Sequence, residues 1–341
     1  MPETTAGQIK FYSYNTDEYS FEGDFTLEQF DKLESKKHVN WINIITANNT
    51  GLVHKAADVF KFHPLITEDI LNVNQRAKIE SYGDSQFVVI RMFAIINNRI
   101  EDQQVAFVLR DNIIISFREE DYGILKKSIE DKIISNIGPI RKKGEDFLFY
   151  SLLDTIIDNY YLVLNFLNEK IETLNAEILR KSDTHQMVDL QQLKSDVLYI
   201  RKHIMPVRDL INTLSRNDID YFEEENRFFI RDLQDHMVRN VEEIEFHRDQ
   251  LSGLLDLYYS LQENKMNTVM KTLTGISFVL LPLNFLASLY GMNFSKIPHA
   301  DDENGFWEMV GIMALVALIL ITIAIRFNWL SSKDFGKNKD A

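Results

Sequence analysis

The sequence contains no cysteine, so disulfide bonds and thiolate metal sites are excluded, and a metal ion must be bound by oxygen or histidine nitrogen. It also lacks an excess of basic residues. The formal net charge is -14 at pH 7, which argues against a nucleic-acid-binding protein. The sequence shows no phosphate-binding loop, zinc-protease motif or nucleophile–base signature, so nothing favours an enzyme. We therefore expect neither an organic cofactor nor a nucleic-acid partner.

Two stretches near the C-terminus lack charged side chains. The first comprises the 24 residues after Lys271, and the second comprises the 17 residues after Glu308, with aromatic residues at its flanks. A spanning helix needs about 20 mostly apolar residues, and aromatic side chains favour the membrane interface. The sequence therefore predicts two transmembrane helices, at 272–293 and 307–327.

Lysine and arginine are unevenly placed around these two helices. They lie before the first helix and after the second (Lys265, Lys271, Arg326, Lys333, Lys337, Lys339). The loop at 294–306, which joins the two helices, carries one lysine, Lys296, and three acidic residues, Asp301, Asp302 and Glu303. Positively charged residues stay on the cytoplasmic side of a membrane. We therefore expect both termini, with the basic tail at 328–341, to be cytoplasmic in a multi-pass protein of the plasma (inner) membrane. The acidic loop should face outward.

Residues 1–140 alternate runs rich in β-branched and aromatic residues with helix-like runs. The predicted strands are Ile9–Tyr14, Val39–Thr46, Phe87–Ile96 and Val105–Phe117, and the predicted helices are Leu27–Glu34, Val53–Phe60 and Ile66–Val73. The segment Asn97-Asn98-Arg99 has the composition of a turn and should join the last two strands. This region is expected to be a compact cytoplasmic α/β domain.

Helix-breaking residues are scarce in the next part of the chain, where Pro206 is the only proline between Gly144 and Pro282. Residues 141–216 are expected to form two antiparallel helices, the second bent or broken near Pro206. The two helices are expected at 147–179 and 187–214. A third helix is expected to begin near residues 217–218, to form a stalk over 217–271 and to continue into the first transmembrane helix.

Polar residues recur along this third helix. From Asp256, alternate steps of four and three residues reach Ser260, Glu263, Asn267, Met270, Thr274, Ser277, Leu281, Asn284 and Ser288, a set that we call the polar stripe. Its 3.5-residue period is typical of one face of a helix in a bundle. The hydroxyl groups could simply hydrogen-bond the backbone or a neighbouring helix. Asn284 at mid-span favours a pore lined by a ring of identical helices, because polar groups in a membrane are costly unless they face protein or water.

The residue types of the stripe suit a hydrated cation. Mg²⁺ dehydrates reluctantly, and neutral amide and hydroxyl groups can hydrogen-bond its water shell without holding the ion too tightly. Met270 and Leu281 would form apolar constrictions that gate by dewetting. Asp256 would form an acidic ring at the inner mouth.

The end of the stripe carries a more specific motif. Tyr290-Gly291-Met292-Asn293 closes the first transmembrane helix and is followed by a short loop and the second helix. This arrangement resembles the signature of the CorA family of magnesium channels. Further similarity lies in Val269–Thr274, Leu281-Pro282-Leu283, His63-Pro64-Leu65, Glu68–Asn72, Gln75-Arg76, Lys78, Glu80, Asp232, His236 and Ser252–Asp256. The resemblance covers most of the chain from about residue 40.

The resemblance implies a funnel-shaped homopentamer in the lipid membrane whose first transmembrane helix lines the pore. Gly291, Met292 and Asn293 match the outer filter of the family. Asn267, Met270 and Asp256 match an inner polar ring, a gate and an acidic entrance, and Ser277 and Ser288 share the stripe with them. Many members carry threonine where this chain has Asn284, and this departure bears on ion preference.

The resemblance also implies regulatory Mg²⁺ between neighbouring subunits. Asp69 and Asp232 match the carboxylates that share this ion, while Glu68, His236 and Asp154 match a second site. Loss of the ion would leave like charges facing one another and loosen the ring. Asp232 and His236, four residues apart, could equally be an ordinary ion pair. The expected function is therefore a channel for Mg²⁺, and also for Co²⁺ and Ni²⁺, gated by cytoplasmic Mg²⁺. The alternatives are a Zn²⁺ transporter of the same fold, with or without proton coupling, and a membrane-anchored metal sensor that conducts nothing.

Overall fold

The computed structural model describes residues 7–32, 38–180, 183–216, 221–293, 304–327 and 329. The chain divides into two units, residues 1–254 and 255–341, and the long helix α6 contributes residues to both. The first unit holds a sheet and a group of long helices, and the second holds two apolar helices.

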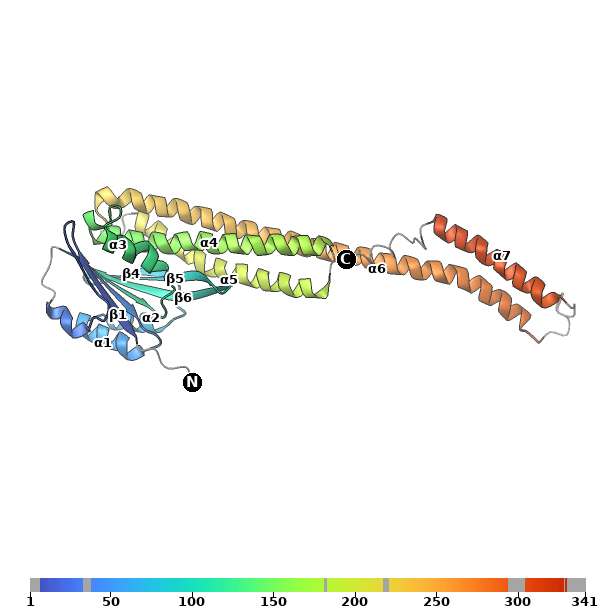
Figure 1. Cartoon of the computed structure of the whole chain (residues 1–341), viewed down its shortest axis with the longest axis horizontal. Helices are drawn as coiled ribbons and strands as arrows, with labels where there is room; N and C mark the ends of the chain where they lie inside the picture. Colours follow the sequence, from blue (N-terminus) through green and yellow to red (C-terminus); the bar gives the residue numbers. More distant parts are fainter. Residues whose placement is uncertain are drawn as a thin grey trace. The chain divides into compact units, whose positions relative to one another are not determined.

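The sheet of the first unit has seven strands among the described residues, in the order β2-β1-β3-β7-β6-β5-β4. Figure 1 draws this sheet in blue to teal, with labels on β1, β4, β5 and β6. Its strands are β1 (Gln8–Tyr14), β2 (Tyr19–Glu22), β3 (Val39–Ile45), β4 (Lys78–Tyr82), β5 (Ser85–Ile96), β6 (Arg99–Arg110) and β7 (Ile113–Arg118). Neighbouring strands are antiparallel except β3 and β7, which run parallel. A parallel pair needs a long crossover. Here the chain between them contains α1 (Thr50–Phe60), α2 (Pro64–Leu71) and three strands.

Both faces of the sheet are covered. On one face, strand residues such as Phe11 and Ile42 form a buried cluster with Val53 of α1 and Ile66 of α2. On the other face lies α4 (Glu145–Arg180), where the ring of Phe149 meets that of Phe107 edge-on at 5.6 Å. Because neither face meets water there, the segments Phe87–Ile90 of β5 and Val105–Leu109 of β6 are apolar on both sides and read as continuous hydrophobic runs.

The predicted hairpin turn is confirmed. Ile96 of β5 pairs with Arg99 of β6. Between them, Asn97 and Asn98 adopt left-handed φ values of 50° and 63°. Two consecutive left-handed residues form the hairpin turn whose twist suits the flanking strands, and asparagine tolerates that conformation well.

The prediction of one strand over Val105–Phe117 is wrong. The chain turns at Asp111, whose φ is 42°, so that β6 ends at Arg110 and β7 returns antiparallel to it. Two strands were not predicted. Strands β2 and β4 lie at the edges of the sheet and have little buried apolar surface.

Short helices complete this unit. They are η1 (Leu27–Lys32), η2 (Lys126–Glu130), α3 (Asp131–Ser135), η3 (Ile140–Lys142) and η4 (Glu224–Asn226). The helix expected at Leu27–Glu34 is the 3-10 helix η1, and residues 33–34 lie outside the described part. The helices expected at 53–60 and 66–73 correspond to α1 and α2.

The long helices differ from expectation at two points. Helix α4 matches the helix expected at 147–179. Helix α5 (Thr184–Ser215) continues through Pro206, so of the predicted bend or break the break does not occur. The third helix, α6 (Arg227–Tyr290), begins about ten residues later than expected and is preceded by η4. Helix α6 then runs without interruption for 64 residues, or about 96 Å along its axis at about 1.5 Å per residue.

Three described helices have the length and apolar composition to cross a membrane: α4, α6 and α7 (Gly305–Arg326). In α4, 67% of the residues in its most apolar 18-residue stretch are buried, because this helix packs against the sheet and neighbouring helices. In α6 and α7 the corresponding share is 11%. The two predicted transmembrane segments therefore lie in the two helices whose apolar side chains are open. Of the acidic loop predicted at 294–306, residues 294–303 lie outside the described residues, and α7 begins at Gly305. The tail at 328–341, apart from Trp329, also lies outside them.

Candidate metal sites and pore-lining helix

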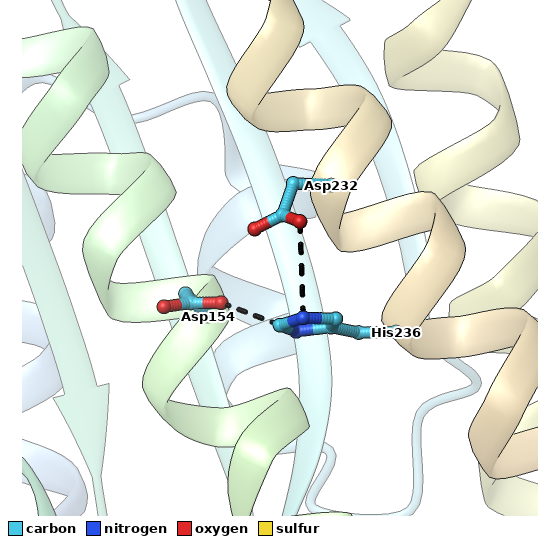
Figure 2. Close-up of side chains that lie close together, drawn as sticks. All are labelled: Asp154, Asp232 and His236. Carbon is cyan, nitrogen blue, oxygen red and sulfur yellow. Dashed lines mark ion pairs between the residues drawn. The ribbon is translucent and has the colours of Figure 1, made fainter.

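A cluster of ionisable side chains lies where α4 meets the first part of α6. Asp154 projects from α4, and Asp232 and His236 project from successive turns of α6 (Figure 2). One ligand atom of each of the three lies within 4.8 Å of the other two. His236 Nδ1 is 3.6 Å from an Asp154 oxygen, and His236 Nε2 is 3.8 Å from an Asp232 oxygen. The structure thus brings together three of the five predicted regulatory residues within one chain.

A fourth member of this cluster was missed from the sequence. Asp158 lies one turn after Asp154 on α4, and its carboxylate is 3.5 Å from His236 Nδ1. The spacing was a usable signal, because residues i and i+4 share a helix face. Both α4 and α6 therefore present a pair of ligand-type residues at this spacing.

The cluster has an excess of negative charge, because it contains three carboxylates and one imidazole. Burial, followed by the neighbouring carboxylate of Asp158, raises the pKa of Asp154 to about 6, and His236 only partly opposes this. In the described structure, Asp154 Oδ1 and His236 Nδ1 are buried and make no hydrogen bond. Buried polar atoms normally have partners, and an ion is one recognised reason for an exception.

The cluster fits a divalent cation by its donor set. Carboxylate oxygens suit Mg²⁺, and an imidazole nitrogen additionally suits Co²⁺, Ni²⁺ and Zn²⁺. A hollow of about 90 Å³ adjoins His236, with Asp158, Arg239 and Asn240 also in its lining. A water molecule occupies about 30 Å³ of liquid, so this hollow has room for an ion with part of its water shell. The Arg239 side chain is the one cationic group in this lining.

Asp69 lies in a different cluster, at the end of α2. The residue is 7% exposed. Its carboxylate accepts a hydrogen bond from Gln75 Nε2 and forms an ion pair with Lys78 Nζ at 2.7 Å. Lys78 also contacts Glu80, at 2.7 Å. The neighbouring Glu68 is exposed. Within one chain, therefore, Asp69 already has an internal cation, whereas Glu68 points to the surface.

The polar stripe lies on an open face of α6 in the second unit. Every stripe residue from Asp256 to Ser288 is exposed, except Ser277, which is half-buried. The apolar members Met270 and Leu281 are 54% and 66% exposed. The hydroxyl of Thr274 donates to the Met270 carbonyl at 2.8 Å, so this residue does hydrogen-bond its own helix.

The buried positions of α6 in this unit lie on the opposite face. They are Tyr258, Gly275 and Val279, and the last two are flanked by the half-buried Thr272, Pro282, Leu283 and Leu286. At about 100° per residue, their mean direction is nearly opposite to that of the stripe. Trp329, which follows α7, packs edge-on against Phe278 with ring centroids 5.3 Å apart. The stripe is thus left exposed, while the buried positions of α6 lie on its other side.

Helix α6 ends at the predicted motif. Tyr290 is its last residue, and the Gly291 amide donates to the Ala287 carbonyl at 3.0 Å. A β-carbon at Gly291 would lie 3.4 Å from that carbonyl oxygen, an ordinary contact within one chain. Met292 and Asn293 are exposed beyond the helix end. The conformation of a single chain therefore does not itself require glycine here.

The chain is similar in sequence to known metal-ion transport proteins. The family described as CorA-like Mg²⁺ transporter protein matches residues 36–326. The chain is 33% identical over 325 residues to the cobalt/magnesium transport protein CorA of Thermotoga maritima, covering 95% of this chain and 92% of that protein. It is 22% identical to the zinc transport protein ZntB of Yersinia pseudotuberculosis, covering 91% of this chain and 92% of that protein.

The fold gives the same result. The complete structure of the CorA magnesium transporter from Methanocaldococcus jannaschii aligns with a TM-score of 0.80 at 20% identity, covering 96% of this chain and 99% of that one. The full-length CmaX protein aligns with a TM-score of 0.73, also at 20% identity, covering 96% of this chain and 100% of that one. An α/β unit, a long helix and two apolar C-terminal helices are thus a shared architecture, and the chain belongs to the family of CorA-like Mg²⁺ transporter proteins.

Proposed function

We propose that this protein is one subunit of a homopentameric channel through which Mg²⁺, and also Co²⁺ and Ni²⁺, enters the cell. The observation that carries the proposal is the placement of the polar stripe. It lies opposite the buried positions Gly275 and Val279 of α6, and the motif Gly291-Met292-Asn293 follows it directly. A single chain leaves this stripe open, and a closed ring of identical helices is the arrangement that would enclose it. The similar proteins of Thermotoga maritima and Methanocaldococcus jannaschii are cobalt/magnesium transport proteins, which supports Mg²⁺ and Co²⁺.

The ion would pass along the stripe in its water shell. The carboxamide of Asn293 would bind hydrated Mg²⁺ at the outer mouth, and Asn284, Ser288, Ser277 and Asn267 would offer further oxygens along the path. Mg²⁺ keeps several waters in most protein sites, so hydrogen bonds to that shell select the ion without trapping it. Met270 and Leu281 would close the path by dewetting, and Asp256 would gather cations at the inner mouth.

Cytoplasmic Mg²⁺ would regulate the channel through sites in the first unit. Asp69 of one subunit would share an ion with Asp232 of the next, and the second site would use Glu68, His236 and Asp154. The contact of Asp154, Asp232 and His236 within one chain supports the second set, with Asp158 as an added ligand. Each bound ion favours the bound state by RT ln(1 + [L]/Kd), about 2.7 kcal/mol at a hundredfold excess of ligand. Repeated around a ring, such terms would hold a closed state.

The membrane orientation follows from charge. Lys265 and Lys271 precede the apolar part of α6, and Arg326 ends α7. This distribution supports an orientation with both termini in the cytoplasm of a protein of the inner membrane. The apolar surfaces of the two helices would face lipid.

Flux through purified protein in liposomes is the direct test. Uptake of Mg²⁺, Co²⁺, Ni²⁺ and Zn²⁺ would be measured with and without a pH gradient, while Mg²⁺ on the cytoplasmic face is titrated. We expect Mg²⁺ uptake that falls as cytoplasmic Mg²⁺ rises, and loss of uptake in Asn293→Ala. Absence of flux for every divalent ion would refute a channel, and Zn²⁺ uptake driven by the pH gradient would favour a zinc transporter. Retained uptake in Asn293→Ala would refute the assigned filter. Unchanged inhibition by Mg²⁺ in Asp69→Asn combined with Asp232→Asn would refute the regulatory role.

A further inference from the structure

The carboxylate of Asp69 is occupied by groups of its own chain. Its Oδ2 atom lies 2.7 Å from Lys78 Nζ, and its Oδ1 atom accepts from Gln75 Nε2. The side chain of Asp69 is only 9% exposed, whereas that of Lys78 is 29% exposed. A cation that approached Asp69 from outside would thus meet an ammonium group already in place.

Lys78 has a second acceptor within reach. Its Nζ atom lies 2.7 Å from Glu80 Oε2, and that carboxylate also accepts a hydrogen bond from the Tyr82 hydroxyl at 2.7 Å. The side chain of Glu80 is 40% exposed. If Lys78 left Asp69, its ammonium could remain paired with Glu80 at the surface. Lysine is suited to such an exchange because its charge is compact, its stem is flexible and its donors can rotate.

We propose that Lys78 is an internal competitor for the regulatory divalent cation, and that Mg²⁺ binds Asp69 by displacing the Lys78 ammonium toward Glu80. This rests on the proposed regulatory role of Asp69. Two consequences follow. The metal-free site is held together by Lys78 instead of carrying an uncompensated buried carboxylate. The apparent affinity for Mg²⁺ is lower than that of an unoccupied carboxylate site, because each binding event must break an ion pair.

This exchange changes how loss of Mg²⁺ would act. Repulsion between Asp69 and a facing carboxylate would be weak without metal, since the Asp69 charge is already balanced. The switch would then lie in the replacement of one cation by another. A divalent ion can bridge to a second carboxylate, whereas Lys78 binds within its own chain. Metal would therefore join subunits, and lysine would release them.

Two substitutions test the exchange in opposite directions on the full-length protein. Lys78→Met removes the competing charge and is expected to lower the Mg²⁺ concentration for half-maximal binding at least tenfold, which equals about 1.4 kcal/mol. Glu80→Gln removes the second carboxylate that Lys78 contacts among the described residues and leaves it Asp69, and is expected to raise that concentration severalfold. Lys78→Arg keeps the charge and should resemble the unmodified protein more than Lys78→Met does. Lys55→Met removes a lysine from the exposed Lys55–Glu28 pair and serves as the matched control.

The readouts separate this inference from the proposed function. Mg²⁺ binding is measured by calorimetry and by protection of the detergent-solubilised protein from proteolysis, and flux is measured separately in liposomes. Opposite shifts for Lys78→Met and Glu80→Gln, with no shift for Lys55→Met, support displacement. Unchanged binding in both variants, or a shift in the same direction, overturns it. Should Lys78→Met fail to assemble, an unchanged midpoint in Glu80→Gln overturns the proposal by itself. Absence of flux alongside opposite binding shifts would refute the channel but leave the exchange standing.

Discussion

The imidazole of His236 on α6 lies 3.6 Å from the carboxylate of Asp154 on α4, in a cluster with more negative than positive groups. Two roles follow from this arrangement. The cluster joins two helices of the first unit, and without a divalent cation it carries an electrostatic cost. That cost can be measured through the protonation of Asp154.

Substitution of Asp154 should stabilise the metal-free protein in a pH-dependent way. The folded pKa of about 6 lies above the ordinary value of 3.8. The folded state therefore holds the proton more tightly, and stability falls as pH rises from about 3.8 through about 6. A shift of about two pKa units corresponds to about 3 kcal/mol. When a chelator keeps the protein free of metal, Asp154→Asn should raise the free energy of unfolding by up to about 3 kcal/mol at pH 8 and by about half as much at pH 5.

Thermal unfolding at both pH values, with and without added Mg²⁺, checks this prediction. Asp158→Asn is the control. The Asp158 side chain is 63% exposed, so its negative charge should destabilise the folded protein less than that of Asp154 does. An equal effect of Asp154→Asn at pH 5 and pH 8 would contradict the assigned pKa. Added Mg²⁺ should stabilise the unmodified protein more than the variant.

His236 should matter more for Co²⁺ than for Mg²⁺. Imidazole nitrogen is a favourable ligand for transition metals, whereas Mg²⁺ prefers oxygen. His236→Gln is therefore expected to weaken Co²⁺ binding at least tenfold and Mg²⁺ binding by less, in calorimetric titrations. His185→Gln is the control, because His185 forms a similar i,i+4 pair with Asp189 at 2.9 Å but is strongly exposed. Equal losses for both ions would mean that the imidazole does not ligate the metal.

Asn284 should be needed for flux and not for folding. It is exposed on the face of α6 opposite Gly275 and Val279, so a leucine there would lie on the exposed surface of the described chain. Asn284→Leu is expected to reduce Mg²⁺ flux at least tenfold, because an apolar ring dewets the path. Ala287→Leu adds a similar side chain outside the stripe and should have little effect. Equal flux in the two variants would argue that Asn284 does not face the ion path.

Asp146 should be a major contributor to the stability of the first unit. This buried carboxylate accepts hydrogen bonds from the Phe147 amide, the Glu223 amide and Asn226 Nδ2, at 2.7 to 2.9 Å, and so ties the start of α4 to the segment before α6. Hydrogen bonds to charged groups contribute about 1.5–3 kcal/mol each. Asp146→Ala is expected to lower the free energy of unfolding by about 3 kcal/mol or more, measured by thermal unfolding. The exposed Asp189→Ala should be nearly neutral, and similar losses for the two would contradict this role.

Much of the architecture could be predicted because its signals are local. The Asn97-Asn98 turn needs left-handed residues, and long helices follow from scarce proline and glycine. The division of Val105–Phe117 into two strands could not be predicted from alternation, since both faces of the sheet are buried there. The local signal there is the polar pair Asp111-Asn112, which has the composition of a turn and in which Asp111 adopts a left-handed φ.

The candidate sites were predictable to different degrees. The stripe and its final motif could be found because one helix carries them, and periodicity determines its face. The Asp154–Asp158–His236 contact depends on how α4 and α6 pack, which the spacing within either helix does not specify. The pairing of Asp69 with Lys78 depends on the bend between α2 and β4, and so appears only in the folded chain.

The open face of α6 also bears on how this protein is made. A newly synthesised copy would enter the membrane with the amide of Asn284 turned toward lipid, and only further copies could shield it. The polar stripe of such a chain therefore stays exposed to lipid until the chain associates with other copies of itself. Yield in a cell should then depend on the local concentration of nascent chains, and unassembled copies should be the form that membrane proteases remove.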